Sequence, residues 1–267
     1  MAANEISQQQ APVVVELGGV QKVFSNGTRA LDPISLSIRE GEFISIIGPS
    51  GCGKSTLLRL IAGLAAPSAG TMRISSEIRE AAIGFVFQSP TLMPWSNVQA
   101  NVRLPLDLLH APRAEADEKV QRALDGVGLT DFAHFHPREL SGGMQMRVSI
   151  ARALATSPRL LLMDEPFGAL DEITRNRLDR DLSSLCERER LTVLFVTHSI
   201  YEASFLSSRV LVMSSRPGRI FSDVAVEDSR PRTEAFRSSQ SFIRLAARLS
   251  ATLAAAMHDG EKSGVKP

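Results

Sequence analysis

The sequence predicts an α/β protein in which a mostly parallel sheet is covered by helices on both faces. Two observations favour this fold class. Short apolar runs alternate with helical patterns along the chain, and one purely helical stretch, at about residues 96–155, interrupts the alternation. That stretch is expected to be an insertion between two halves of the α/β core. At 267 residues, the chain can hold one large domain with a subdomain.

The predicted strands are short and rich in β-branched or aliphatic residues. They are expected at residues 13–17, 34–38, 42–47, 71–75, 83–87, 160–163, 191–196 and 209–213. Helices are expected from residue 56, at about 114–126, where leucine and valine recur at helical spacing, and at about 141–156 and 172–189. The last of these helices is expected to be a charged surface helix. Turn residues at 25–27 and 66–70 separate the first strands.

Both ends of the chain lie outside this alternation. Residues 1–12 carry neither a basic segment nor an apolar core, so a loose tail is expected and not a signal peptide. The main domain is expected at 13–225, followed by a helical extension at 226–267. One face of a helix in that extension carries Phe242, Leu245, Ala246, Leu249 and Leu253. Two arginines interrupt this short apolar face, so docking on the core is expected rather than on a membrane.

Composition and charge exclude several classes of function. The chain has 43% hydrophobic and 22% charged residues, and no apolar run approaches the roughly 20 residues that a membrane span needs. A formal net charge of +1 gives no basic footprint for nucleic acid. Two cysteines, Cys52 and Cys186, indicate a reducing compartment without a disulfide framework. The cytosol is therefore the expected compartment.

The stretch GPSGCGKST fits the phosphate-binding loop pattern G-x-x-x-x-G-K-[ST], and it lies between a predicted strand and a predicted helix. Glycines let backbone N–H groups surround a triphosphate, and the start of the helix adds partial positive charge. Lys54 is expected at the β- and γ-phosphates, and the Ser55 hydroxyl at Mg²⁺. The residues expected to bind ATP here are Gly48, Pro49, Ser50, Gly51, Cys52, Gly53, Lys54, Ser55 and Thr56.

The thiol of Cys52 allows two interpretations. It could react with alkylating reagents and thereby block ATP, or it could be a small residue that fills a tight turn without reactive character.

Two acidic residues follow the predicted strand at 160–163. A carboxylate at the carboxyl end of a buried strand lies where ligands bind in open α/β sheets. Asp164 is expected to orient Mg²⁺ or its waters, and Glu165 to align or deprotonate the attacking water. A solvated acidic turn is the simpler alternative, but the phosphate loop earlier in the chain favours the catalytic interpretation.

The stretch LSGGM at 140–144, followed by a predicted helix, strongly resembles the signature of ATP-binding-cassette (ABC) ATPases. The resemblance covers about residues 13–220 and includes the motifs of the family in order. It implies the fold of a P-loop NTPase, with a RecA-like core, an antiparallel β subdomain and the inserted α-helical subdomain at about 96–155.

The resemblance also assigns roles to individual residues. Phe24 would stack on adenine, although the residues alone favour a place in the core. Gln88 would contact Mg²⁺ and water, residues 168–171 would form the loop called the D-loop, and His198 would contact the γ-phosphate. The resemblance thus implies catalytic residues at Glu165, His198 and Gln88, and Mg²⁺ ligands at Ser55, Gln88 and Asp164.

The signature implies a partner. Backbone N–H groups at Ser141, Gly142 and Gly143, at the start of a helix, form a second anion site. The family uses this site in trans, against the γ-phosphate that a second copy of the chain binds. ATP would then stabilise a closed dimer, and hydrolysis would release it.

Within the family, residues 87–95 and 215–220 resemble the nitrate, sulfonate, taurine and bicarbonate import group. The resemblance implies an ATPase subunit on the cytoplasmic face of the inner membrane. Its expected partners are integral membrane permease subunits and, indirectly, a solute-binding protein; no nucleic acid partner is expected. Residues 75–82 depart from the pattern of the group, because the stretch is short and lacks the usual glycine-containing turn.

Trp95 lies just after Gln88, where the family receives the coupling helices of the membrane subunits. An exposed tryptophan there suits an interface, and core packing is the alternative. The other function considered is a soluble ABC ATPase that is not coupled to transport. Those of DNA repair carry long coiled coils, which this sequence lacks.

Overall fold

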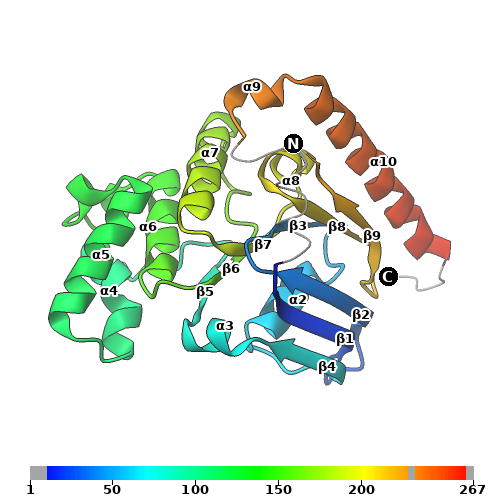
Figure 1. Cartoon of the computed structure of the whole chain (residues 1–267), viewed down its shortest axis with the longest axis horizontal. Coiled ribbons are helices and arrows are strands. Elements are labelled where there is room, and N and C mark those ends of the chain that lie inside the picture. The colour runs from blue at the N-terminus through cyan, green and yellow to red at the C-terminus, as the bar shows by residue number, and fades with distance from the viewer. Residues whose placement is uncertain (1–10, 228–231, 263–267) are drawn as a thin grey trace.

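The structure is a computed structural model that describes residues 11–227 and 232–262. Most of the predicted N-terminal tail and parts of the predicted extension lie outside the described residues. In Figure 1 a central sheet carries a group of helices on one side, drawn in green, and a small sheet drawn in blue below it. None of the described helices is long and apolar enough to cross a membrane.

The central sheet has six strands in the order β5-β6-β7-β3-β8-β9. The strands are β5 (Ile83–Val86), β6 (Leu160–Asp164), β7 (Thr192–Val196), β3 (Phe43–Ile47), β8 (Arg209–Met213) and β9 (Ile220–Ala225). All pairs are parallel except β8 with β9. Every residue of β3, β6 and β7 is buried, which is typical of parallel strands covered on both faces. The predicted mostly parallel α/β sheet is confirmed, but β9 was not predicted.

Successive residues of the central strands pack into different clusters. Leu160 and Leu162 of β6 pack with the helix α2 (Lys54–Ile61) and with the smaller sheet. Leu161 and Met163 pack with the helices on the opposite face. This alternation follows from the two-residue period of a strand and gives the sheet one apolar layer on each face.

The smaller sheet is antiparallel, with the order β2-β1-β4. Its strands are β1 (Val13–Val23), β2 (Arg29–Arg39) and β4 (Ala69–Ile74), and β1 and β2 are longer than predicted. The pairing register shifts within β1 between Gly18 and Gln21, so the apolar alternation ends before the strand does. Gly70, predicted to lie in a turn, belongs to β4. A Cβ there would lie 2.4 Å from the Gly19 carbonyl oxygen, so only glycine fits.

The stretch at 75–82, which departs from the family pattern, contains a short helix, α3 (Ser76–Glu80). The Ser75 side chain accepts a hydrogen bond from the Ile78 N–H and thereby caps this helix. Ile78 is buried against the same apolar cluster as β1 and α2. This helix was not predicted, because five residues are too few to show helical spacing.

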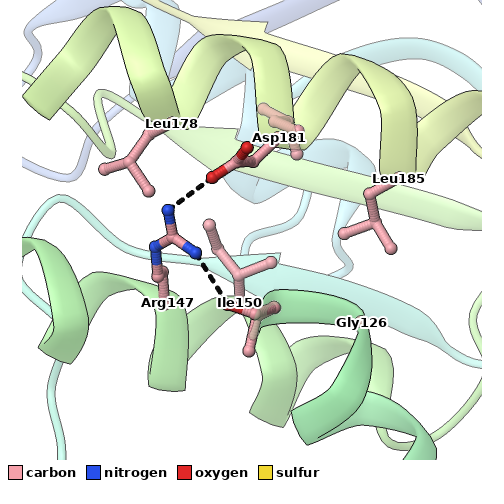
Figure 2. Close-up of a pocket in the computed structure, with 8 residues that line it drawn as sticks. Gly126, Arg147, Ile150, Leu178, Asp181 and Leu185 are labelled. Carbon is pink, nitrogen blue, oxygen red and sulfur yellow. Dashed lines mark hydrogen bonds and ion pairs between the residues drawn. The ribbon is translucent and has the colours of Figure 1, made fainter. Parts of the chain in front are cut away.

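The helical subdomain lies between β5 and β6 in the chain, as predicted. It consists of α4 (Val98–Leu108), α5 (Arg113–Val127), the 3₁₀ turns η1 (Thr130–Phe132) and η2 (Pro137–Glu139), and α6 (Gly142–Leu154). Figure 2 shows where α6 meets the core helix α7 (Glu172–Arg188). Arg147 of α6 donates to the Val127 carbonyl oxygen at 2.8 Å and pairs with Asp181 of α7. This arginine therefore connects the subdomain to the core.

The helix α8 (Ile200–Leu206) precedes β8, and the helices α9 (Glu234–Arg237) and α10 (Gln240–Lys262) follow β9. Figure 1 shows α10, in red, along the edge of the molecule beyond β8 and β9. Leu249 and Ala256 of α10 are fully buried and pack with Val210 and Val212 of β8. Phe242 is buried as well, with the Tyr201 ring stacked 6.0 Å from it. The apolar face of the helix therefore docks on the core.

Candidate functional site

The phosphate loop connects β3 to α2, which is the predicted arrangement. Gly53 has a φ of 104°, in the left-handed region that favours glycine. A Cβ at this position would lie 2.6 Å from the Leu31 side chain and 2.9 Å from the Ala30 carbonyl oxygen. The path of the loop therefore requires glycine both for its conformation and for its packing on β2.

Lys54 is the first residue of α2, and only 4% of it is exposed. Its ammonium group donates to the carbonyl oxygens of Gly48 and Pro49 at 2.9 Å each. The cation thus lies within the curve of the loop, next to the backbone N–H groups that begin the helix. A cation and a helix N-terminus at one place are suited to bind phosphate.

A second segment supports the phosphate loop, and the sequence analysis did not recognise this role. Arg216 donates to the Gly51 carbonyl oxygen at 3.1 Å. A Cβ on Gly218 would lie 1.9 Å from the Cys52 carbonyl oxygen, so the two backbones are in direct contact. Both segments follow strands of one parallel sheet, whose carboxyl ends share an edge, so a common edge was predictable; the neighbouring position of the two strands was not.

Cys52 is 1% exposed within this contact. Burial raises the pKa of its thiol, and the nearby Lys54 ammonium offsets only part of that effect. A buried thiol with a raised pKa is a poor nucleophile. The structure therefore favours the interpretation of Cys52 as a small residue that fills a tight turn.

Asp164 lies at the carboxyl end of β6, beneath the start of α2. Its Oδ1 accepts a hydrogen bond from the Ser55 hydroxyl at 2.8 Å. This brings a hydroxyl oxygen and a carboxylate together, and both are the hard oxygen ligands that Mg²⁺ prefers. The pairing joins two residues that the sequence analysis assigned to one metal ion.

Two side chains that follow the neighbouring strands contact the carboxylate of Glu165. The His198 Nε2 lies 2.6 Å from the Glu165 Oε1, and the Gln88 amide donates to the Oε2 at 3.3 Å. His198 follows β7, Glu165 follows β6 and Gln88 follows β5. Glu165 has a φ of 50°, in the left-handed region that non-glycine residues rarely adopt. Its carboxylate is thus held by two polar partners at the sheet edge that also carries the phosphate loop.

Phe24 follows β1 directly and is 44% exposed. The Lys22 ammonium lies 5.6 Å from the centre of its ring. The core position that the residues alone favoured is therefore wrong. The tip of the strand is open to solvent, and the ring is accessible for stacking.

The signature residues belong to another part of the molecule. Ser141 caps α6, since its hydroxyl accepts a hydrogen bond from the Met144 N–H at 3.3 Å. Ser141 and Gly142 are exposed, and Gly143 packs closely on Thr174 at the start of α7. Figure 1 places α6 in the helical group, whereas α2 lies beneath the central sheet. The structure therefore does not gather the signature and the phosphate loop of one chain at one site.

Residues 31–168 match the family described as ABC transporter. An uncharacterized ABC transporter ATP-binding protein of Methanocaldococcus jannaschii is 47% identical over 82% of this chain and 85% of its own length. The aliphatic sulfonates import ATP-binding protein SsuB of Bacillus cereus is 42% identical, over 85% of this chain and 92% of its own. The nitrate import ATP-binding protein NrtD of a Synechocystis species is 42% identical, over 84% and 88%.

Among solved structures, a dimeric ATP-binding cassette in a post-hydrolysis state, bound to ADP and Pi, superposes with a TM-score of 0.70. It is 35% identical and covers 80% of this chain and all of its own length. These similarities confirm the resemblance that the phosphate loop and the LSGGM stretch indicated. The chain belongs to the ABC transporter family, and within it is an ATP-hydrolysing cassette.

Proposed function

We propose that this chain powers the uptake of a small solute, such as nitrate, a sulfonate, taurine or a related anion. In this role it binds integral membrane subunits as a peripheral protein on their cytoplasmic side, and a solute-binding protein delivers the solute. Support comes from relatives that are named as sulfonate and nitrate import ATP-binding proteins. The exposure and rigid support of Trp95 carry the proposal within the structure.

Trp95 is 77% exposed, although tryptophan is usually largely buried. The segment before it is fixed from two sides. Asn101, itself fully buried, bonds the backbone N–H and carbonyl of Met93 at 2.7 and 3.2 Å. Arg152 donates to the carbonyl oxygens of Pro90 and Thr91 at 2.9 and 2.8 Å. A large aromatic side chain that is exposed on a fixed loop is a typical anchor of a protein interface.

The same loop connects to the reacting centre, because it begins directly after Gln88. We assign hydrolysis to Glu165 as the base, with His198 and Gln88 as its partners. Lys54 and the loop at 48–56 bind the phosphates, and Phe24 stacks on the base. A partner subunit at Trp95 would therefore lie close to the residues that contact Glu165.

The oxygens of Ser55 and Asp164 fit Mg²⁺, and the Gln88 side chain is the third proposed ligand. The ion would neutralise charge on the β- and γ-phosphates. A second copy of the chain completes each site by presenting Ser141, Gly142 and Gly143. The dimeric relative with ADP and Pi supports this assembly.

The proposal is tested by co-expressing the tagged chain with candidate permease subunits from the same organism. Trp95→Ala should reduce recovery of the permease and uptake of the labelled solute, while the ATPase activity of the isolated chain stays near the wild-type value. Ile243→Ala is a matched control, because Ile243 is 59% exposed on the distant helix α10. Equal loss of ATPase activity and uptake, with a lower melting temperature, would assign Trp95 to folding instead.

The same purification distinguishes the alternative function. A soluble ABC ATPase that is not coupled to transport would be recovered without membrane proteins, and Trp95→Ala would change nothing. The solute class is then read from competition: unlabelled nitrate, taurine and bicarbonate are each added to the uptake assay.

A further inference from the structure

A buried cluster of charges lies behind the catalytic loops and plays no part in the site described above. It joins α7, α8 and the segment at 232–237, which are well separated in the chain. Asp179 of α7 is fully buried, and Glu202 of α8 and Arg232 are 4% and 5% exposed. Two further guanidinium groups complete the cluster, those of Arg175 and Arg237.

The C-terminal segment enters this cluster through two arginines. Arg237 donates to the Asp179 Oδ2 at 2.9 Å, and its guanidinium carbon lies 3.9 Å from the centre of the Phe205 ring. Arg232 donates to the carbonyl oxygens of Ser204 and Phe205 at 2.9 and 2.8 Å. A cation on the last carbonyls of a helix stabilises its end, so Arg232 caps α8.

The second part of the cluster reaches the loop at 168–171. The Arg175 Nε lies 3.7 Å from the Glu202 Oε1, which joins α7 to α8. The other end of the same guanidinium donates to the Leu170 carbonyl oxygen at 2.8 Å. One arginine thus contacts both α8 and the loop before α7.

Glu202 in turn reaches the residue before His198. The Thr197 hydroxyl donates to the Glu202 carboxylate and accepts a hydrogen bond from the Ser199 N–H at 2.9 Å. The backbone on both sides of His198 is therefore fixed by one hydroxyl, and that hydroxyl is oriented by Glu202. His198 is the residue whose Nε2 contacts Glu165.

Stability alone is a weak reason for such a cluster. Burial raises the pKa of Asp179 to about 6 and that of Glu202 to about 7, so the folded chain disfavours both charges despite their arginine partners. Apolar side chains of similar size would fill the same space without this cost. The positions of the hydrogen bonds suggest a different benefit. Glu202 and Arg175 bond to Thr197 and Leu170, which lie in the loops next to the reacting centre. Arg232 bonds to the end of α8, the helix that follows His198.

We propose that Glu202 and Arg175 are positioning residues for ATP hydrolysis, and that Arg237 connects the C-terminal segment to the helices that carry them, through Asp179 of α7 and Phe205 of α8. Glu202 holds Thr197 and thereby the orientation of His198, while Arg175 holds the loop at 168–171. The inference rests on the proposed role of His198. It predicts that the C-terminal segment determines the catalytic rate without contacting the nucleotide.

Thr197→Val is the central test, because it removes the hydroxyl and keeps the shape of the side chain. We expect kcat to fall about 10- to 100-fold, the effect of a misplaced catalytic group, with little change in KM for ATP. Thr197→Ser keeps a hydroxyl and should restore most of the rate. In the double variant with His198→Ala, Thr197→Val should cause no further loss, because both changes disable one group.

Arg237→Ala tests the link to the C-terminal segment, and it should also lower kcat at unchanged KM. Arg244→Ala is the matched control, since Arg244 is an exposed arginine on α10 of the same segment. Melting temperatures are measured for all variants. A lower melting temperature with a normal kcat for Thr197→Val and Arg237→Ala would overturn the inference and leave the cluster a structural role.

Failure of the proposed function gives a different result. If His198→Ala keeps the wild-type kcat, the role of His198 is wrong, and a lower kcat in Thr197→Val would then contradict positioning through that residue. If His198→Ala lowers kcat while Thr197→Val does not, the role of His198 stands and the inference is wrong.

Discussion

The two regions of this chain that are proposed to bind anions, the phosphate loop and the signature, are built in different ways. The phosphate loop is enclosed: Lys54 is buried within it, and Arg216 and Gly218 support it from the next strand. The signature at Ser141 and Gly142 is exposed at the start of α6, in the helical subdomain. The first region lies beside the carboxylates of Asp164 and Glu165, whereas the second offers a hydroxyl and backbone N–H groups.

From this difference we expect that one chain alone is not a complete enzyme. In the proposed roles, the enclosed region binds ATP and carries the residues for hydrolysis. The exposed region can cover a phosphate but has neither base nor metal ligands. If each completes the other across two chains, ATP favours the closed dimer because it contacts both regions only there.

The largest loss of ATP trapping is expected when either region is disabled by mutation. Lys54→Ala removes a cation from the phosphates, and Ser141→Arg blocks the signature, so each homodimer should lose ATP trapping entirely. In a mixed dimer, the intact phosphate loop of one chain faces the intact signature of the other, and one complete site returns. With Glu165→Gln in both chains, size-exclusion chromatography with Mg-ATP should detect the heterodimer.

The controls are the two homodimers and circular dichroism of each variant. Because hydrolysis is blocked in both chains, the measurement does not require that a single site supports turnover. If the mixture traps no more ATP than either variant alone, the comparison fails, and the signature would serve its own chain.

The next effect concerns the enclosed region alone. Glu165→Gln should retain ATP binding and lose about 10²–10⁴ in the rate of hydrolysis, which is the usual contribution of a general base. The variant should accumulate as an ATP-bound dimer, since release follows hydrolysis. A variant that hydrolyses ATP at the wild-type rate, or that stays monomeric with ATP, would contradict the assignment.

The enclosed region was also the more predictable one. Its motif, its preceding strand and its following helix are local in the sequence, and β3 and α2 lie where they were expected. Its support by Arg216 and Gly218 was missed, because that contact depends on β8 lying next to β3 in the sheet. Local patterns identify a loop, whereas the order of strands decides what packs against it.

The helix α7 illustrates the opposite case. A charged surface helix was predicted at 172–189, and a helix is present, but Asp179 within it is fully buried. Its partner Arg237 lies 58 residues later, beyond the reach of any helical spacing. Buried charges are therefore the part of this fold that sequence reasoning could not supply, since pairing across elements decides whether a charge is buried.

A smaller effect is expected at the edge of the enclosed region. Phe24→Ala removes an exposed ring, and base stacking is worth about 1–3 kcal/mol, or roughly 5- to 150-fold in affinity. ATP affinity should fall within this range, and Phe24→Trp should restore it. Isothermal titration with ATP and with inorganic triphosphate distinguishes lost stacking on the base from weaker binding of the phosphates. Only ATP should bind more weakly, and equal weakening of both ligands would exclude stacking on the base.

The smallest effect is expected at Cys52, and it tests how closed the phosphate loop is. With 1% exposure and a raised pKa, the thiol should react slowly with iodoacetamide, at similar rates with and without Mg-ATP. Because the thiolate is the reacting form, the rate of alkylation should keep rising as the pH is increased beyond the ordinary pKa of a thiol, about 8.5. Peptide mass spectrometry distinguishes Cys52 from Cys186, which is also buried. The denatured protein gives the labelling rate of fully accessible thiols. Fast labelling that Mg-ATP prevents would show an open, reactive loop, and the contrast between an enclosed phosphate loop and an exposed signature would then be wrong.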